Sequence, residues 1–115
     1  MERLINYFKL LSDETRLRIM VLLYHNEFCV CQITGMTGIF QPNISKHLAR
    51  LRDMGLVKDE KREQYSYYSL NIKDKLFEDI LKKIVPNVED YPILKSDIEK
   101  SKAAEKYIEL TSMNK

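Results

Sequence analysis

The middle of the chain constrains the fold more than any other part of the sequence. An amphipathic helix is expected from Pro42, a residue suited to the first turn of a helix, to about Met54, and Gly55 can cap its end. Two short runs with strand character follow at 56–61 and 65–70, and three polar residues separate them. A helix that leads directly into a β-hairpin is the second half of a winged helix-turn-helix.

The residues before this segment predict the other helices that such a fold needs. Apolar residues recur at helical spacing over 2–11, which predicts a first helix. The run over 17–24 is apolar on nearly every side, as expected of a helix at the centre of a core. A short third helix is expected over 32–36, and Gly38 is expected to end it. The first half of the helix-turn-helix is therefore present as well.

The residues after the hairpin add helices but leave little room for a second core. A helix is expected over 74–85, then a loop over 86–92 and a helical stretch over about 93–110. With 115 residues the chain is long enough for one domain with a hydrophobic core. We therefore predict a fold that is mainly α with a β-hairpin wing. It consists of a winged helix-turn-helix domain at 1–85 and a C-terminal helical extension at 86–115.

Charge and hydropathy limit where the protein acts and what it contacts. No apolar run approaches the ~20 residues of a membrane span, and the N-terminus lacks the features of a signal peptide, so we expect a cytoplasmic protein that does not contact a membrane. The net charge is only +2, but residues 41–73 hold seven Lys or Arg against four Asp or Glu. A mildly basic middle is consistent with contact to phosphate.

The helix expected at 42–54 divides into two faces. Ile44, Leu48 and Leu51 lie within one narrow arc, which would hold the helix to the core. The other face offers an amide for adenine, cations for guanine or phosphate, and small residues that allow close approach to a major groove. Any surface helix shows such a division, but the basic hairpin that follows favours double-stranded DNA as the partner. The candidate DNA contacts are Gln41, Asn43, Ser45, Lys46, His47 and Arg50 on the helix, and Lys61 and Arg62 on the hairpin.

Four blocks, at 11–19, 41–48, 51–57 and 67–70, carry a further signal by their sequence, order and spacing. In these blocks the chain resembles the ArsR/SmtB family of metal-responsive repressors, over about residues 4–85. The resemblance implies a homodimer formed by the first helix and the helix at 74–85. It also implies that the dimer binds an inverted-repeat operator and is released from it by an inducer, with no permanently bound cofactor.

Two positions depart from the pattern of that family. Phe40 stands where the family usually has a Ser that caps the recognition helix. The first N–H groups of the helix then need other acceptors, such as the side chains of Gln41 or Asn43, or a DNA phosphate. Gln64 stands where the turn of the wing often has Gly, which leaves the geometry of the tip open.

Two cysteines, Cys29 and Cys31, lie near the start of the expected third helix. In a reducing compartment such a pair indicates a metal, metalloid or redox site rather than a disulfide framework. Side chains at i and i+2 of a helix point about 200° apart, so the two sulfurs can hold one ion only from a non-helical or unwound segment. An inducer that draws the sulfurs together would then distort the start of the helix-turn-helix.

The segment around the two cysteines resembles the Cys-Val-Cys motif of arsenic- and cadmium-type members of the family. The positive end of a helix stabilises thiolates at such a place. Arsenic-type members often have a third cysteine at the position of Thr34, and the His residues of the family's zinc site are absent from the helix at 74–85. Two sulfurs leave zinc or cadmium under-coordinated, whereas they suit trivalent arsenic or antimony, or an organoarsenical. The resemblance therefore implies As(III) or Sb(III) as the inducer, bound by Cys29 and Cys31.

Three other interpretations stay open from the sequence. The repressor could sense oxidation through its thiols, or both cysteines could be buried packing residues without any metal response. A winged helix can also bind protein instead of DNA. An enzyme, such as a small thiol oxidoreductase or an arsenate reductase, is not expected. The sequence has no Gly-rich phosphate loop, no Cys-x-x-Cys motif and no Ser/His/Asp set.

Overall fold

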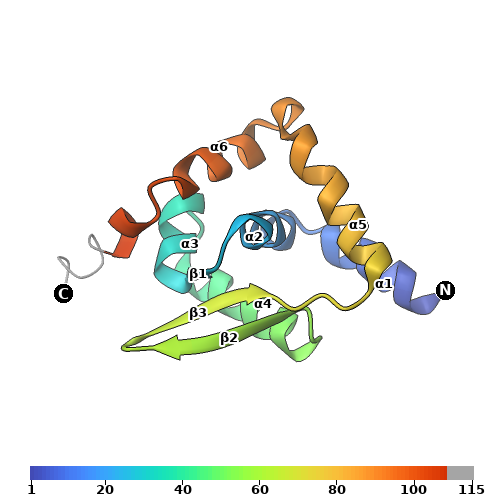
Figure 1. Ribbon diagram of the computed structural model, residues 1–115, viewed down its shortest axis with the longest axis horizontal. Coiled ribbons are helices and arrows are strands. Elements are labelled where there is room, and N and C mark those ends of the chain that lie inside the picture. The colour runs from blue at the N-terminus through green and yellow to red at the C-terminus, as the bar shows by residue number, and fades with distance from the viewer. Residues whose placement is uncertain (109–115) are drawn as a thin grey trace.

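Helices form most of the structure, and one small antiparallel sheet lies beside them (Figure 1). This computed structural model describes residues 1–108. The mainly α fold with a hairpin is therefore confirmed, and none of the described helices is long and apolar enough to cross a membrane. The helices are α1 (Glu2–Leu11), α2 (Glu14–His25), α3 (Val30–Thr37), α4 (Gln41–Asp53), α5 (Lys75–Ile84), the 3-10 helix η1 (Val85–Asp90) and α6 (Pro92–Ser101), and the strands are β1 (Phe28–Cys29), β2 (Val57–Arg62) and β3 (Tyr65–Leu70).

The central helix is α2, with α5 and α6 arching over it (Figure 1). Residues 19–23 of this helix are all buried, as the apolar sequence predicts. The helix begins before the apolar run because the Asp13 carboxylate accepts a hydrogen bond from the backbone N–H of Arg16 at 3.0 Å. This cap places the first, polar turn of α2 next to α1.

The helix-turn-helix consists of α3, a short turn and α4. Gly38 ends α3 in a left-handed conformation (φ 73°), and its N–H donates to the Thr34 carbonyl at 2.8 Å. Phe40 precedes α4 without a side-chain cap, as its apolar side chain predicts. The core face of α4 is also as predicted, because Ile44, Leu48 and Leu51 are fully buried.

The wing is the antiparallel pair of β2 and β3. The strands pair from Val57 with Leu70 to Arg62 with Tyr65, so the turn holds two residues rather than the three expected from the sequence. The left-handed residue of this turn is Glu63 (φ 58°), one position before Gln64. Glu63, rather than Gln64, therefore adopts the left-handed conformation at the tip of the wing, at the position where a hairpin turn of this length favours glycine.

A two-residue strand, β1, adds a third strand to the wing. Phe28 pairs with Tyr68 and Cys29 with Tyr67, which makes β3 the central strand. The sequence does not predict this strand, because two residues are too few to show an alternating pattern. The pairing ties the chain just before α3 directly to the wing.

The C-terminal extension packs onto α2 and α3. The expected loop at 86–92 is wrong in part, because η1 forms there with a proline near its start, where a missing N–H costs nothing. Leu94, Asp97 and Ala104 are buried, and Ala104 belongs to the same hydrophobic core as the winged helix. The chain is helical again at 105–108, and the end of the expected helix, 109–110, lies outside the described residues.

Candidate functional site

The two cysteines lie at the junction of β1 and α3. Cys29 is the last residue of the strand and the N-cap of the helix, with an extended backbone (φ −88°, ψ 169°), and Cys31 follows in the first turn. Because Cys29 is extended, the two side chains converge, and their Sγ atoms lie 2.9 Å apart. Cys29 therefore has the non-helical backbone that the pair would need to hold one ion. The two sulfurs lie together without a ligand, so an inducer would not have to draw them together to reach both.

Burial and hydrogen bonding hold this junction in place. The N–H of Cys29, a residue only 2% exposed, donates to the side-chain oxygen of Gln32 at 3.0 Å, as in a capping box. Cys31 is half-buried. Burial, together with the hydrogen bond to Cys29, raises the pKa of the Cys31 thiol to about 12. The start of α3 alone would favour a thiolate, but burial outweighs this effect and Cys31 keeps its proton at neutral pH.

The wing closes one side of the thiol pair. Tyr67 pairs with Cys29 across the sheet, and burial, followed by the charges of Cys29 and Cys31, raises the pKa of the Tyr67 hydroxyl. The Arg62 guanidinium lies 5.1 Å from the centre of the Tyr67 ring and donates to both carboxylate oxygens of Glu27, two residues before Cys29. A strand ladder and an ion pair thus connect the wing to the thiols.

The thiol pair offers two sulfur donors. In the described part of the chain, no three or more His, Cys, Asp or Glu side chains gather as a metal site would require. Thr34, at the position where the family resemblance suggests a third ligand, has a buried Oγ1 without a hydrogen-bond partner among residues 1–108. A ligand of this site would therefore bond to two sulfurs and carry its remaining bonds itself.

The outer side of α4 carries most of the predicted DNA contacts. The helix has 13 residues, which span about 20 Å at 1.5 Å per residue. The major groove of B-DNA is roughly 12 Å wide, so a helix of this length can reach base edges with one part and the sugar-phosphate backbone with another. The predicted contacts on this helix that are exposed are Gln41, Asn43, Ser45, Lys46 and Arg50.

The other three predicted DNA contacts are in different surroundings. The His47 side chain is only 14% exposed, and its Nε2 lies 3.9 Å from the carboxylate of Asp13 at the start of α2. Burial lowers the pKa of His47. Lys61 is exposed on the hairpin, whereas the Arg62 guanidinium is held in the ion pair with Glu27. Contact with DNA by these three residues stays a prediction.

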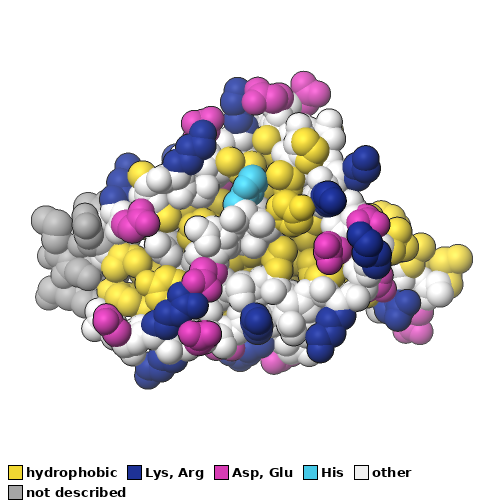
Figure 2. Space-filling view, viewed as in Figure 1, with side chains coloured by type: hydrophobic (Ala, Val, Ile, Leu, Met, Phe, Trp, Pro, Cys, Tyr) yellow, Lys and Arg dark blue, Asp and Glu magenta, His cyan; other side chains and the backbone are white. Residues whose placement is uncertain are grey.

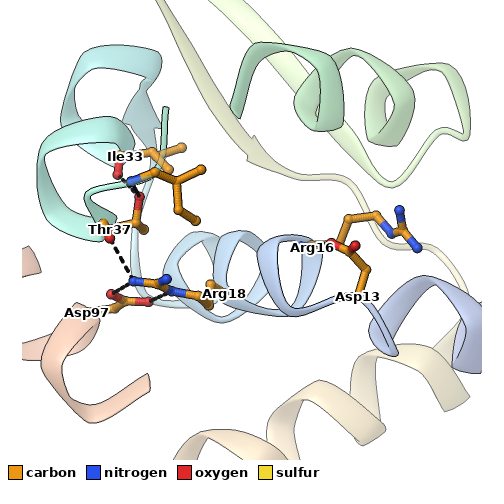
Figure 3. A network of polar contacts seen from close by, with 7 residues as sticks. Asp13, Arg16, Arg18, Ile33, Thr37 and Asp97 are labelled. Carbon is orange, nitrogen blue, oxygen red and sulfur yellow. Dashed lines mark hydrogen bonds and ion pairs between the residues drawn. The ribbon is translucent and has the colours of Figure 1, made fainter. Parts of the chain in front are cut away.

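A buried ion pair fastens the C-terminal extension to the helix-turn-helix (Figure 3). Arg18 on α2 donates through Nε and Nη2 to the two carboxylate oxygens of Asp97 on α6, each at 2.8 Å. The same Nη2 donates to the carbonyl of Thr37, the last residue of α3, at 2.9 Å. The Thr37 hydroxyl in turn donates to the Ile33 carbonyl and accepts from the N–H of Ile39. A residue outside the winged helix thus helps to fix the turn before α4.

Sequence reasoning missed the partners that come from distant parts of the chain. Asp97 carried a signal, because it lies three residues after Leu94, at a spacing that puts a carboxylate on the apolar face of a helix. A buried carboxylate needs a cationic partner, which α2 supplies. Glu27 and Tyr67 carried no such signal, since their positions beside the thiols depend on the pairing of β1 with β3.

A separate cleft of about 740 Å³ lies between α2, α5, η1 and α6. Figure 2 shows hydrophobic side chains gathered on this face of the molecule. Neither the cysteines nor the predicted DNA contacts line the cleft, so it is distinct from both. Its hydrophobic wall consists of Leu17, Ile80, Ile84, Tyr91 and Leu94.

The known proteins that this chain is similar to are transcriptional regulators. Residues 13–59 match the family described as bacterial regulatory protein, arsR family. The chain is 43% identical over 65 residues to the arsenic resistance transcriptional regulator ArsR1 of Pseudomonas putida, covering 56% of this chain and 51% of that protein. It is 46% identical over 68 residues to the arsenical resistance operon repressor of Escherichia coli, covering 58% of each. The chain thus spans little more than half the length of these two proteins.

A shorter relative and two solved structures are covered more fully. The match to the transcriptional repressor SdpR of Bacillus subtilis is 38% identical over 66 residues, which is 57% of this chain and 73% of that protein. The transcriptional regulator HlyU of Vibrio vulnificus superposes with a TM-score of 0.65 at 29% identity, covering 72% of this chain and 84% of that one. The transcriptional repressor BigR of Xylella fastidiosa superposes with a TM-score of 0.64 at 26% identity, covering 72% of this chain and 83% of that one.

Proposed function

This chain belongs to the arsR family of bacterial regulatory proteins, which are transcriptional regulators rather than enzymes, and we propose that it is a metalloid-responsive repressor. In this proposal it binds operator DNA and releases it when Cys29 and Cys31 bind trivalent arsenic or antimony. The observation that carries the proposal is the pair of thiols 2.9 Å apart at the start of α3. Support also comes from two relatives that are named as arsenic-resistance regulators.

The chemistry of trivalent arsenic suits a site with two thiols. Arsenous acid exchanges two of its three hydroxyl groups for sulfur: two As–S bonds form, two As–O bonds break, and each S–H proton leaves with a hydroxyl as water. The product keeps one As–OH group, or one carbon substituent if the ligand is an organoarsenical. Zinc in a structural site needs four protein ligands, and two sulfurs do not supply them.

Binding changes the spacing of the two sulfurs. If the bond length of about 2.3 Å between zinc and sulfur is taken as a guide, two sulfurs at the pyramidal angle of trivalent arsenic are roughly 3.5 Å apart. The sulfurs of Cys29 and Cys31 lie 2.9 Å apart, so the ligand opens the pair. That movement acts on the first turn of α3 and on the pairing of Cys29 with Tyr67 in the wing. The bound metalloid then lowers DNA affinity by its preference for the opened shape.

A homodimer through α1 and α5 completes the DNA-binding unit in this proposal. Ile5 and Phe8 on α1 are 44% and 53% exposed, and Leu76 on α5 is 52% exposed. Large apolar side chains grouped on two neighbouring helices favour coverage by a second copy of the chain. A two-fold dimer matches an inverted-repeat operator. We place the dimer in the cytoplasm, where reducing conditions keep both thiols free.

The test is a promoter-binding titration with a panel of inducers. A labelled duplex from upstream of the protein's own coding region is titrated by fluorescence anisotropy, alone and with arsenite, antimonite, cadmium, zinc or peroxide. We expect binding in the nanomolar range that arsenite and antimonite weaken at least tenfold and that cadmium and zinc leave unchanged. Failure to retain the promoter would contradict DNA repression, and full affinity in arsenite and antimonite would contradict metalloid sensing.

The closeness of the two sulfurs also favours a second candidate, a thiol redox sensor. Peroxide would oxidise the two thiols to a disulfide and be reduced to two waters. The raised pKa of Cys31 counts against this reading, because the thiolate is the form that attacks peroxide. If peroxide, but not arsenite, releases the promoter, and dithiothreitol restores binding, the redox reading replaces the metalloid reading.

A further inference from the structure

A polar pocket of about 300 Å³ opens where α1, α2 and α4 meet. It lies beside the C-terminal half of the helix that carries the predicted base contacts. Three of its side chains are cationic and none is a carboxylate, and the sequence reasoning had assigned only one of the three to DNA. The residues that line it are Asn6, Lys9 and Leu10 of α1, Arg16 of α2, Arg50 of α4 and Met54.

Backbone carbonyls, rather than a carboxylate, hold Arg16 at this pocket. Its Nε donates to the Leu10 carbonyl at 2.9 Å and its Nη2 to the Lys9 carbonyl at 3.3 Å, both at the end of α1. The Asp13 carboxylate serves as the cap of α2 and accepts the backbone N–H of Arg16. In Figure 3 the Arg16 guanidinium lies on the α1 side of α2, away from the pair of Arg18 and Asp97. Arg16 is thus a fixed cation with donors to spare.

The other two cations of the pocket are not neutralised within the protein. Lys9 and Arg50 are exposed, and neither forms an ion pair with a carboxylate within residues 1–108. Two other arginines, Arg3 and Arg52, are paired with carboxylates 3.3 and 3.4 Å away. Cations that converge on one pocket repel one another and together raise the local concentration of anions.

We propose that this pocket binds a phosphate of the operator backbone, an assignment that rests on the DNA binding proposed above. α4 is longer than the major groove is wide, so when its first turns lie in the groove its last turns lie over the groove edge. Arg50 and Met54 are at that end, and Arg16 and Lys9 extend the cationic surface sideways along the backbone. The planar, anchored Arg16 orients the phosphate, and Lys9 adds a flexible point charge.

The salt dependence of operator binding tests this assignment. Removing the cation of one phosphate contact makes the plot of log K against log salt less steep by about 0.9. At 0.15 M salt this corresponds to about a fivefold loss of affinity per contact. We expect Lys9→Gln to produce this change once per subunit, equally on operator and on a scrambled duplex, because a phosphate contact carries no sequence information. Lys100→Gln, an exposed lysine of α6 on the far side of α2, serves as the matched control.

The outcomes separate this assignment from the proposed function. If the wild-type chain does not bind the operator at all, the proposed function fails. If it binds and Lys9→Gln keeps the slope and affinity of Lys100→Gln, the phosphate site is refuted while DNA binding stands. A third arm titrates inorganic phosphate in the absence of DNA. Thermal stabilisation by millimolar phosphate that Lys9→Gln abolishes, with an unchanged DNA slope, would identify a free oxyanion site and overturn the assignment.

Discussion

Replacing Asp97 by alanine removes one partner of the most deeply buried ion pair in the described chain. The Asp97 side chain is 1% exposed and that of Arg18 14%, and two hydrogen bonds of 2.8 Å join them. The aspartate is the main reason why the pKa of Arg18 is raised. With Asp97 gone, the guanidinium stays charged and keeps only the carbonyl of Thr37 as a strong acceptor.

The expected cost follows from the burial of the charge that remains. Breaking a buried ion pair from one side destabilises a protein by about 3–5 kcal/mol, mainly because the other charge is left unpaired. Arg18 keeps one hydrogen bond and some contact with solvent, so we expect the lower end, about 3 kcal/mol. Asp97→Asn, which keeps an acceptor for one donor of Arg18, is expected to cost about half of that. In the double variant Arg18→Met/Asp97→Leu the stranded charge is absent, and part of the loss is expected to return.

Urea unfolding followed by circular dichroism measures this effect. All variants are compared at one protein concentration, because the stability of the proposed dimer would depend on it. The control is Glu99→Ala on the same helix, whose carboxylate is 60% exposed and lies 3.8 Å from Lys102, and it is expected to cost less than about 0.5 kcal/mol. A loss below about 1 kcal/mol for Asp97→Ala would refute the reasoning, since it would mean that α6 does not cover Arg18 in solution.

Three further predictions follow from the site and the turn. Cys31 keeps its proton, and when arsenous acid binds, the two water molecules that it releases take up both thiol protons. No proton is released to the solvent, so arsenite affinity should be nearly constant from pH 6 to 8. Cadmium affinity should rise at least tenfold per pH unit, since a divalent cation must displace the Cys31 proton. Isothermal titrations in which log Kd changes equally with pH for arsenite and for cadmium would contradict this. Lys46→Ala combined with Arg50→Ala should weaken operator binding by several kcal/mol, at about 1–3 kcal/mol per contact, and an unchanged Kd would refute the orientation of α4. Gly38→Ala should lower the free energy of unfolding by about 1–2 kcal/mol. The cost comes from the φ of 73° alone, because nothing lies within 4 Å of the added Cβ. An unchanged free energy of unfolding would contradict the left-handed end of α3.

Local patterns account for the parts of the fold that could be predicted. The spacing of Ile44, Leu48 and Leu51 places one face of α4 on the core, and these residues are fully buried. Gly38 and Gly55 both adopt the left-handed conformation that ends a helix. In each case the decisive interactions lie within a few residues along the chain, which is the range over which sequence periodicity and turn preferences carry information.

Pairings between distant residues account for what the sequence left out. The thiol spacing depends on Cys29 being extended, and it is extended because β1 pairs with β3, some forty residues later in the chain. The Arg18–Asp97 pair bridges 79 positions. The pocket proposed to bind a phosphate likewise gathers side chains from three helices, two of which had no predicted contact with DNA. No short-range pattern fixes such distances, because they are set by how the elements pack.

The response of the operator complex to arsenite, measured with and without the two thiols, tests the central claim most directly. A labelled operator bound to the wild-type protein is titrated with arsenite by fluorescence anisotropy, beside the variant Cys29→Ser/Cys31→Ser. We expect one equivalent of arsenite per subunit to release the wild-type protein, and the variant to bind the operator as tightly as the wild type yet stay bound in arsenite. Release of the variant by arsenite at the same stoichiometry would contradict the account.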